Sequence, residues 1–329
     1  QISNLKLRVS YGSTGNQSGI ADFASQGLWT GGYGYSDKVG SSEGPGTAPL
    51  QIANPNLKWE KTTQFSAGLD LGLFRDRVNF DFGIYNKYTT DVLLQIATPG
   101  STGFSSYLTN FGEISNKGFE LGITTVNIQT KDFTWKTDFN VSQNTNKIEK
   151  IPADIPFAGR DLIRLQQGKP LYSYWLYKQL YVDPQTGDAV FEDVNKDGKI
   201  TADDRQIVGN TWPKFFGGFT NNLSYKNFDL TIFFTYSLGN EIWNHNRMLG
   251  ETGGTLDANR VLLASQLDRW TTPGQITDTP RLTADNYSRQ ENSRFLDDGS
   301  FLRLKNLSLG YTLPGNVLQS IGVRQFRIY

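Results

Sequence analysis

The sequence predicts an all-β fold: a transmembrane antiparallel β-barrel wall with long extracellular loops. Two observations predict this class. Apolar and polar residues alternate with period two in several segments, and the links between these segments are alternately short and long. A third observation excludes a helical membrane protein, because no stretch approaches the ~18 consecutive apolar residues that a spanning helix needs.

The clearest alternation covers residues 77–88. Val78, Phe80, Phe82 and Ile84 share one face, and Asn79, Asp81, Gly83 and Lys87 share the other. Segments 64–73, 133–142 and 228–236 repeat the pattern. A strand in a barrel wall needs only every second residue to face lipid, so a chain of mean hydropathy -0.45 is compatible with a membrane protein.

The links carry the second argument. We expect nine spanning strands, at roughly 4–11, 58–74, 77–90, 115–129, 132–146, 214–226, 227–238, 300–312 and 323–329. Short links at 74–77, 129–132, 225–228 and 314–322 alternate with long polar stretches at 12–57, 89–115, 147–213 and 239–299. Periplasmic turns of barrels are short and extracellular loops long. The alternative is a soluble β-protein whose sheets each have one wet face, since these alternate too.

The segment 300–312 breaks its own pattern. Leu302 and Leu304 have one parity, whereas Leu307, Leu309 and Tyr311 have the other. The change predicts a β-bulge, or a strand that is half above the membrane.

Composition excludes several functions. Among 329 residues, Lys+Arg and Asp+Glu both total 32, so net charge gives no reason to expect a nucleic-acid partner. There is no Cys, which excludes a disulfide framework and a thiolate metal site. The chain opens and stops within strand-like patterns, so we expect a fragment spanning 1–329 of a partial barrel domain.

One chemical motif is present, at 193–204. Asp193, Asn195, Asp197, Lys199 (through its carbonyl), Thr201 and Asp204 occupy positions 1, 3, 5, 7, 9 and 12 of a calcium loop, with Gly198 at position 6. Hard oxygen donors at this spacing suit Ca²⁺.

The loop departs from the helix–loop–helix pattern in two ways. Asp204 replaces the usual Glu, as in dockerin-type loops, and Pro184 and Pro213 flank it in place of two good helices. We therefore expect a structural calcium staple in an extracellular loop insertion at 183–213. The alternative is an Asp- and Asn-rich turn without an ion.

Several segments together resemble the SusC/RagA family of TonB-dependent outer-membrane transporters. They are Leu7–Gln17, Asn54–Phe74, Asn110–Ile123, the stretch from the calcium loop through Phe234, and Phe301–Pro314. The resemblance implies a 22-stranded barrel whose plug and final strands are absent from this sequence. It also implies a bacterial outer-membrane location and active import of oligosaccharides or peptides. The implied partners are a SusD-like surface lipoprotein, TonB (through the missing plug) and outer-membrane lipid.

Aromatic residues of the long loops are candidate substrate contacts. Trp29, Tyr33 and Tyr35 lie in a Gly-rich stretch, Tyr174 and Trp175 in a second cluster with Tyr172 and Tyr177, and Trp243 in the next loop. Interfacial girdles and loop packing use the same residue types, so ring chemistry alone does not separate these roles.

No catalytic residue is predicted, and we do not expect an enzyme. His245 is the single histidine, no GxSxG motif accompanies it, and one His cannot build a zinc site. The alternatives to a transporter are a secreted calcium-stabilised carbohydrate-binding β-protein and a glycoside hydrolase. For the hydrolase, the sequence singles out no carboxylate pair.

Overall fold

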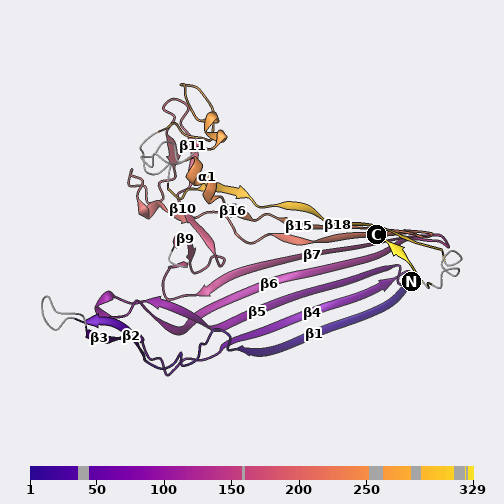
Figure 1. Ribbon diagram of the computed structural model, residues 1–329, viewed down its shortest axis with the longest axis horizontal. Helices are drawn as coiled ribbons and strands as arrows, with labels where there is room; N and C mark the ends of the chain where they lie inside the picture. Colours follow the sequence, from indigo (N-terminus) through magenta and orange to yellow (C-terminus); the bar gives the residue numbers. More distant parts are fainter. Residues whose placement is uncertain (36–43, 158–159, 252–261, 283–289, 315–322, 324) are drawn as a thin grey trace.

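The chain forms one large antiparallel sheet with elaborate loops at one end (Figure 1). This computed structural model describes residues 1–35, 44–157, 160–251, 262–282, 290–314, 323 and 325–329. The nine strands of the sheet are, in spatial order, β1 (Ile2–Asn16), β4 (Glu60–Leu73), β5 (Val78–Ala97), β6 (Ser106–Gln129), β7 (Phe133–Lys150), β14 (Phe215–Tyr225), β15 (Phe228–Leu238), β18 (Phe301–Thr312) and β19 (Arg327–Ile328). We call this sheet the wall.

One face of the wall is apolar across eight strands. The paired residues of one transverse row are Leu7, Leu69, Phe82, Leu121, Val141, Gly217, Tyr236 and Leu302. Leu7 is 76% exposed, and Phe82 and Ile84 are exposed too. No second sheet covers these side chains in the described part of the chain. An uncovered apolar face of this extent requires a lipid neighbour.

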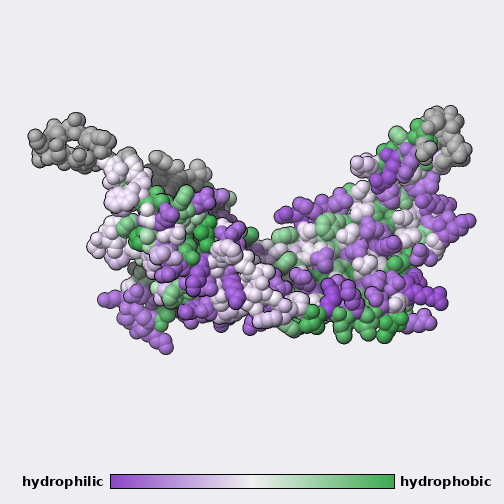
Figure 2. All heavy atoms as spheres, turned by 90° about the horizontal axis from the view of Figure 1, so that it is seen from below, coloured by the Kyte–Doolittle hydropathy of each residue, from purple (hydrophilic) through white to green (hydrophobic). Residues whose placement is uncertain are grey.

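The opposite face is polar. The row directly beside the apolar one consists of Lys6, Asp70, Asp81, Gly122, Asn140, Gly218, Thr235 and Arg303. Figure 2 views the molecule from the β1 side, where hydrophobic residues follow one border of the sheet beside a mainly hydrophilic surface. The predicted split into a hydrocarbon face and a wet face is therefore confirmed, and with it the transmembrane β-barrel class. Over the described residues the sheet stays open, with β1 and β19 at its edges.

The nine predicted strands correspond to the nine strands of the wall, with one error in the loops. The stretch 89–115 is not a long loop, because β5 continues to Ala97 and β6 begins at Ser106. Register shifts around Val92 displace the pairing there, and Asp91 has a positive φ of 56°. Bulged, polar residues in mid-strand hide the period-two signal, so the sequence pattern indicated a loop.

The predicted bulge in β18 is confirmed. Phe233 pairs with Asn306 and Phe234 with Leu304, so Lys305 has no opposite residue. The extra residue brings Leu302 and Leu304 onto the same face as Leu307, Leu309 and Tyr311.

Long connections on one side of the wall fold together into a second body, which we call the cap. Its first part contains β8 (Ile155–Phe157), β9 (Arg160–Leu165), β10 (Ser173–Leu176), β11 (Gln179–Val182), β12 (Ala189–Phe191), η2 (Ala202–Asp204) and β13 (Gln206–Ile207). Its second part contains β16 (Glu241–Trp243), α1 (His245–Gly250), η3 (Ala264–Asp268), η5 (Ser293–Phe295) and β17 (Leu296–Asp298). No described helix is long and apolar enough to cross a membrane.

The two parts of the cap share backbone hydrogen bonds. The Tyr177 N–H donates to the Glu291 carbonyl at 3.1 Å, and the Ser293 N–H donates to the Tyr177 carbonyl at 2.9 Å. Phe295 and Leu176 are fully buried. The predicted insertion at 183–213 is also tied to the later loop, because the Gly274 N–H donates to the Pro184 carbonyl at 2.7 Å and the Arg281 N–H donates to the Gly187 carbonyl at 2.9 Å.

A separate hairpin extends from the same side of the wall. It pairs β2 (Leu28–Tyr35) with β3 (Gly44–Gln51) and lies away from the cap in Figure 1. A short 3-10 turn, η1 (Gly100–Thr102), joins β5 to β6.

Candidate functional site

The polar face of the wall carries a charged centre near β1. The Arg8 Nη2 lies 2.6 Å from the Asp70 Oδ1 and 3.1 Å from the Asp81 carboxylate. A hollow of about 480 Å³ adjoins Arg8, lined also by Gly68, Gly83 and Lys87 among others. Glycine leaves the wall without side chains here, so the hollow can admit groups from another segment or from a solute.

Further along the same face, amide side chains form a connected network. The Tyr85 hydroxyl donates to Asn144 Oδ1 at 3.0 Å, and the amides of Asn144 and Asn146 both donate to Asn116 Oδ1, at 3.2 and 2.9 Å. Gly118 makes room for this network, because a Cβ there would lie 2.6 Å from the Tyr85 hydroxyl. The network fixes several hydrogen-bonding groups on the polar face of the wall.

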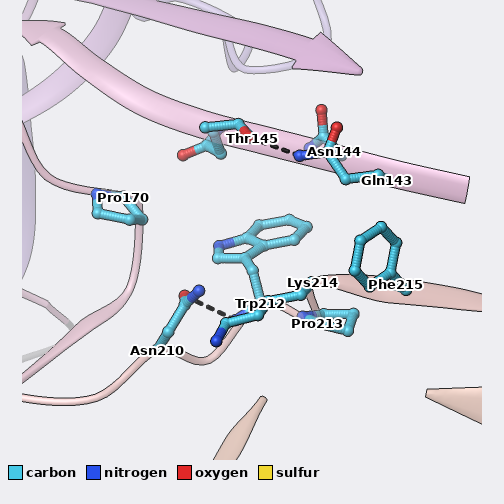
Figure 3. A pocket seen from close by; sticks show the side chains of 10 residues that line it. Gln143, Asn144, Thr145, Pro170, Asn210, Trp212, Pro213, Lys214 and Phe215 are labelled. Carbon is cyan, nitrogen blue, oxygen red and sulfur yellow. Dashed lines mark hydrogen bonds between the residues drawn. The ribbon is translucent and has the colours of Figure 1, made fainter. Parts of the chain in front are cut away.

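A pocket of about 280 Å³ lies where the wall meets the cap (Figure 3). β7 and β14 stop pairing at Ser142 and Phe216, and the chain before β14 diverges. The Trp212 ring lies in the gap, with its Nε1 donating to the Leu171 carbonyl at 3.0 Å. Asn210 holds the turn by accepting the Trp212 backbone N–H at 3.0 Å.

The pocket combines two aromatic rings, Trp212 and Phe215, with several amides. Its polar lining includes Gln143, Asn144, Asn210 and Lys214. Such groups contact sugar hydroxyls and peptide groups equally well. No sequence pattern marks Trp212 as a site residue, because the pocket exists only where two strands stop pairing.

Two of the predicted substrate contacts meet inside the cap. The Tyr174 hydroxyl accepts the Trp243 backbone N–H at 3.1 Å and donates to the Glu241 carbonyl at 3.4 Å. Tyr174 is 7% exposed, and the Trp243 ring packs edge-on against Phe295 at 5.8 Å. In this structure Tyr174 therefore joins the two parts of the cap and is almost completely buried. Burial raises its phenolic pKa.

The other aromatic candidates are spread out. The Trp175 ring is covered by the Arg164 guanidinium, 4.1 Å from the ring centre. Trp29 lies on the separate hairpin and is 68% exposed. Tyr33 and Tyr35 follow on the same strand, and their side chains lie outside the described residues. The structure thus gathers no common aromatic surface from the described members of this set. His245 begins α1 and is exposed.

The predicted calcium loop has a defined conformation. The Asp193 carboxylate accepts the Lys196 and Gly198 N–H groups at 2.6 and 2.8 Å. Asn195 and Asp197 each accept the N–H two residues ahead, at 3.0 and 2.8 Å. Gly198 has a φ of 79°, which is the conformation that position 6 requires of glycine.

Asp204 closes the loop from inside. Its side chain is fully buried, and its two oxygens accept the Val194 and Thr201 N–H groups at 2.9 and 2.7 Å. The hydrogen bond from Thr201 is the main reason that the pKa of Asp204 lies below its ordinary value. Over the described residues, no three His, Cys, Asp or Glu side chains lie close enough to hold a metal by themselves. A bound ion would therefore also use the amide, carbonyl and hydroxyl donors of Asn195, Lys199 and Thr201.

The cap also holds a buried ion cluster that the sequence did not reveal. Arg294 and Glu251 are joined at 2.6 Å, with side chains only 5% and 4% exposed. Arg247 reaches the same carboxylate at 3.5 Å and also pairs with Asp297. Burial lowers the pKa of Arg294 to about 10, so it stays charged at neutral pH.

Comparison with known proteins completes this picture. A family model described as "TonB dependent receptor-like, beta-barrel" matches residues 2–324. The chain belongs to this TonB-dependent receptor β-barrel family. Family members are outer-membrane proteins, so the wall lies in that membrane with lipid on its apolar face.

The relatives agree with the SusC/RagA resemblance. TonB-dependent receptor P3 of Formosa agariphila is 36% identical over all of this chain and 34% of the relative. SusC of Bacteroides thetaiotaomicron is 30% identical over 94% of this chain and 32% of the relative. A solved structure of the RagAB peptide transporter aligns with a TM-score of 0.85 and 28% identity, over 99% of this chain and 36% of that one.

The chain spans about a third of the length of these relatives. They are named receptors and transporters, which confirms the expectation that the chain is not an enzyme.

Proposed function

We propose that this chain is part of the wall of an outer-membrane transporter that imports oligosaccharides or peptides. The two-faced, single-layer wall carries the proposal: its apolar face needs lipid, and its polar face carries hydrogen-bonding groups along a solute path. A soluble carbohydrate-binding protein would not leave apolar residues uncovered on eight neighbouring strands.

Among the relatives, one supports the peptide class by its name. One solved relative is a peptide transporter, and other relatives carry the names SusC and TonB-dependent receptor. The Trp212 pocket and the Asn116–Asn144 network offer amides and aromatic rings, which suit either class. The wall therefore supports import, and the nutrient has to be found by experiment.

Uptake by intact cells tests the transport proposal. Cells with and without the full-length gene are given a radiolabelled peptide digest or a labelled, purified polysaccharide digest as sole nutrient. We expect uptake of one of the two to depend on the gene. Equal uptake of both in the deletion strain would contradict the proposal.

We further propose that a SusD-like lipoprotein closes the extracellular side and that TonB supplies energy through a plug region. The cap and the β2–β3 hairpin rise from the side of the wall where the long loops lie, which is where such a lid would sit. Co-purification of the full-length protein in mild detergent should retain the lipoprotein, and deletion of TonB should abolish uptake while leaving the complex intact. Failure to co-purify the lipoprotein, or uptake that persists without TonB, would contradict this arrangement.

We propose that the loop 193–204 binds Ca²⁺ as a structural staple. Support comes from the residue types at six ligand positions, the left-handed Gly198 and the anchored Asp204. Calcium titration of the full-length protein, followed by limited proteolysis at 193–204, tests this. Protection should rise with Ca²⁺ and not with equal Mg²⁺. A cleavage rate that does not change would contradict metal binding.

A further inference from the structure

The short turns of the wall carry unpaired cations. Turn 74–77 contains Arg75 and Arg77, turn 130–132 contains Lys131, and the turn between β14 and β15 contains Lys226. All four are exposed. Among the described residues, none of them makes an ion pair. We call these four residues the turn cations. Short turns lie on the periplasmic side of such barrels.

A row of aromatic rings lies just inside these turns on the apolar face. Phe133 pairs with Tyr225, Tyr225 with Phe228, and Phe228 with Tyr311, so the rings follow one another across four strands. Ring centres are 6.5 Å apart for Phe133 and Tyr225, and 4.6 Å apart for Phe228 and Tyr311. Aromatic rows of this kind lie at the level of lipid headgroups.

The cations continue directly from the aromatic row. Lys226 Nζ lies 5.4 Å from the centre of the Tyr225 ring. Moving toward the periplasm, a lipid in contact with the wall meets apolar side chains, then rings, then cations. The last level is where a phosphate group lies.

The backbone of the turns has a left-handed conformation that is energetically unfavourable for residues with a side chain. Phe74, Arg75 and Asp76 have φ of 55°, 60° and 61°, and Lys226 has a φ of 52°. Glycine and asparagine adopt this left-handed conformation most easily, and hairpin turns usually use them. A cation occupies two of these positions, although neither Arg nor Lys helps the turn.

We infer that the turn cations and the aromatic row form a docking surface for anionic phospholipid headgroups of the periplasmic leaflet. Charge complementarity selects this occupant, because the turns hold four cations against two acidic residues, Asp76 and Asp132. The continuous row of rings favours lipid over a periplasmic protein, since rings in such rows lie among headgroups and acyl chains. The inference depends on the membrane location of the wall and not on what it transports.

Spin-labelled lipids test this surface in the full-length protein. The protein is reconstituted in phosphatidylcholine with trace spin-labelled phosphatidylglycerol or phosphatidylcholine, and electron paramagnetic resonance gives the relative association of each with the protein. We expect a preference of about fivefold for phosphatidylglycerol, the effect of one cation at an anionic surface. High salt should reduce the preference.

Two variants separate binding from folding. The combined variant R75Q, R77Q, K131Q and K226Q should lose the preference. The double variant Arg75→Asn with Lys226→Asn should lose part of it while folding at least as well, because Asn suits the left-handed positions.

A matched control removes four cations from the polar face: K6Q, K87Q, K136Q and R303Q. It should keep the preference. Equal loss in the control would overturn the inference, because net charge would then be the cause. An unchanged preference in the combined variant would also overturn it, because the anionic lipid would then be selected elsewhere on the protein.

Discussion

The wall and the cap bury their side chains by opposite rules. In the wall, apolar residues such as Leu7 and Leu302 are the exposed ones, and charged residues such as Arg8 and Asp70 face the interior side. In the cap, Phe295 and Leu176 are buried as in a water-soluble protein, together with Glu251 and Asp204. Lipid covers the apolar side chains of the wall, whereas the second loop of the cap covers those of the first. One chain thus contains both kinds of core, and substitutions should separate them.

The largest effect is expected from Glu251→Ala in the cap. It leaves the buried Arg294 without its carboxylate, which costs roughly 3–5 kcal/mol. We expect rapid protease cleavage of the cap, with the heat-modifiable gel shift of the barrel retained. Asp188→Ala is the matched control, because its pair with Arg281 is half-exposed and contributes at most about 1 kcal/mol. Loss of the gel shift in Glu251→Ala would show that the cap and the wall are not independent.

The next effect concerns the two faces of the wall. Ile232→Arg places a cation on the apolar face near the middle of β15 and should cost ~2–4 kcal/mol. Asp81→Asn weakens a half-exposed pair with Arg8 and should cost less than about 1 kcal/mol. Urea titration of folding into lipid vesicles measures both. Equal costs would contradict the assignment of the faces.

A smaller effect is expected from Asp197→Ala in the calcium loop. It removes a proposed ligand and the acceptor for the Lys199 N–H. Because this region is held elsewhere by Trp270, whose Nε1 donates to the Pro184 carbonyl at 2.8 Å, disorder should stay within 183–213. Hydrogen exchange measured with Ca²⁺ and with chelator checks this. In wild type the two conditions should differ over the loop, and in the variant they should coincide.

The smallest effect is a pH dependence of the same loop. Hydrogen bonds from Thr201 and Val194 lower the pKa of Asp204 below its ordinary value of 3.8. A lowered folded-state pKa stabilises the loop at all pH values above 3.8, and this stabilisation is lost as pH falls through the lower value. Protease sensitivity at 193–204 should thus stay constant from neutral pH down to about 4 and then rise. A rise near pH 6 would contradict the assignment to Asp204.

Local patterns predicted much of this molecule. Alternation in 77–88 identified β5 and its two faces, and the parity change after Leu304 identified the bulge in β18. The left-handed turn within 193–204 was also predictable, because the residues that form it are contiguous and Gly198 marks its position; calcium binding there stays a prediction. The extension of β5 beyond Asp91 was not, since bulged pairing erases the period-two signal.

Contacts between residues that are distant in the chain could not be predicted from local patterns. Tyr174 was a candidate substrate contact, yet its hydroxyl bonds to the backbone of residues 241 and 243. Trp212 gained a place in a pocket only because β7 and β14 stop pairing beside it.

By itself, the sequence determined that this protein has a two-faced wall, short turns at one end and a loop with calcium-type donors. It could do so because strand periodicity and loop spacing are local properties of the chain. The tertiary structure alone decided that two loops form one cap, that Glu251 and Arg294 are buried together, and that rings and cations align at the short turns. These features depend on strand register and on contacts between distant residues, which no local pattern encodes.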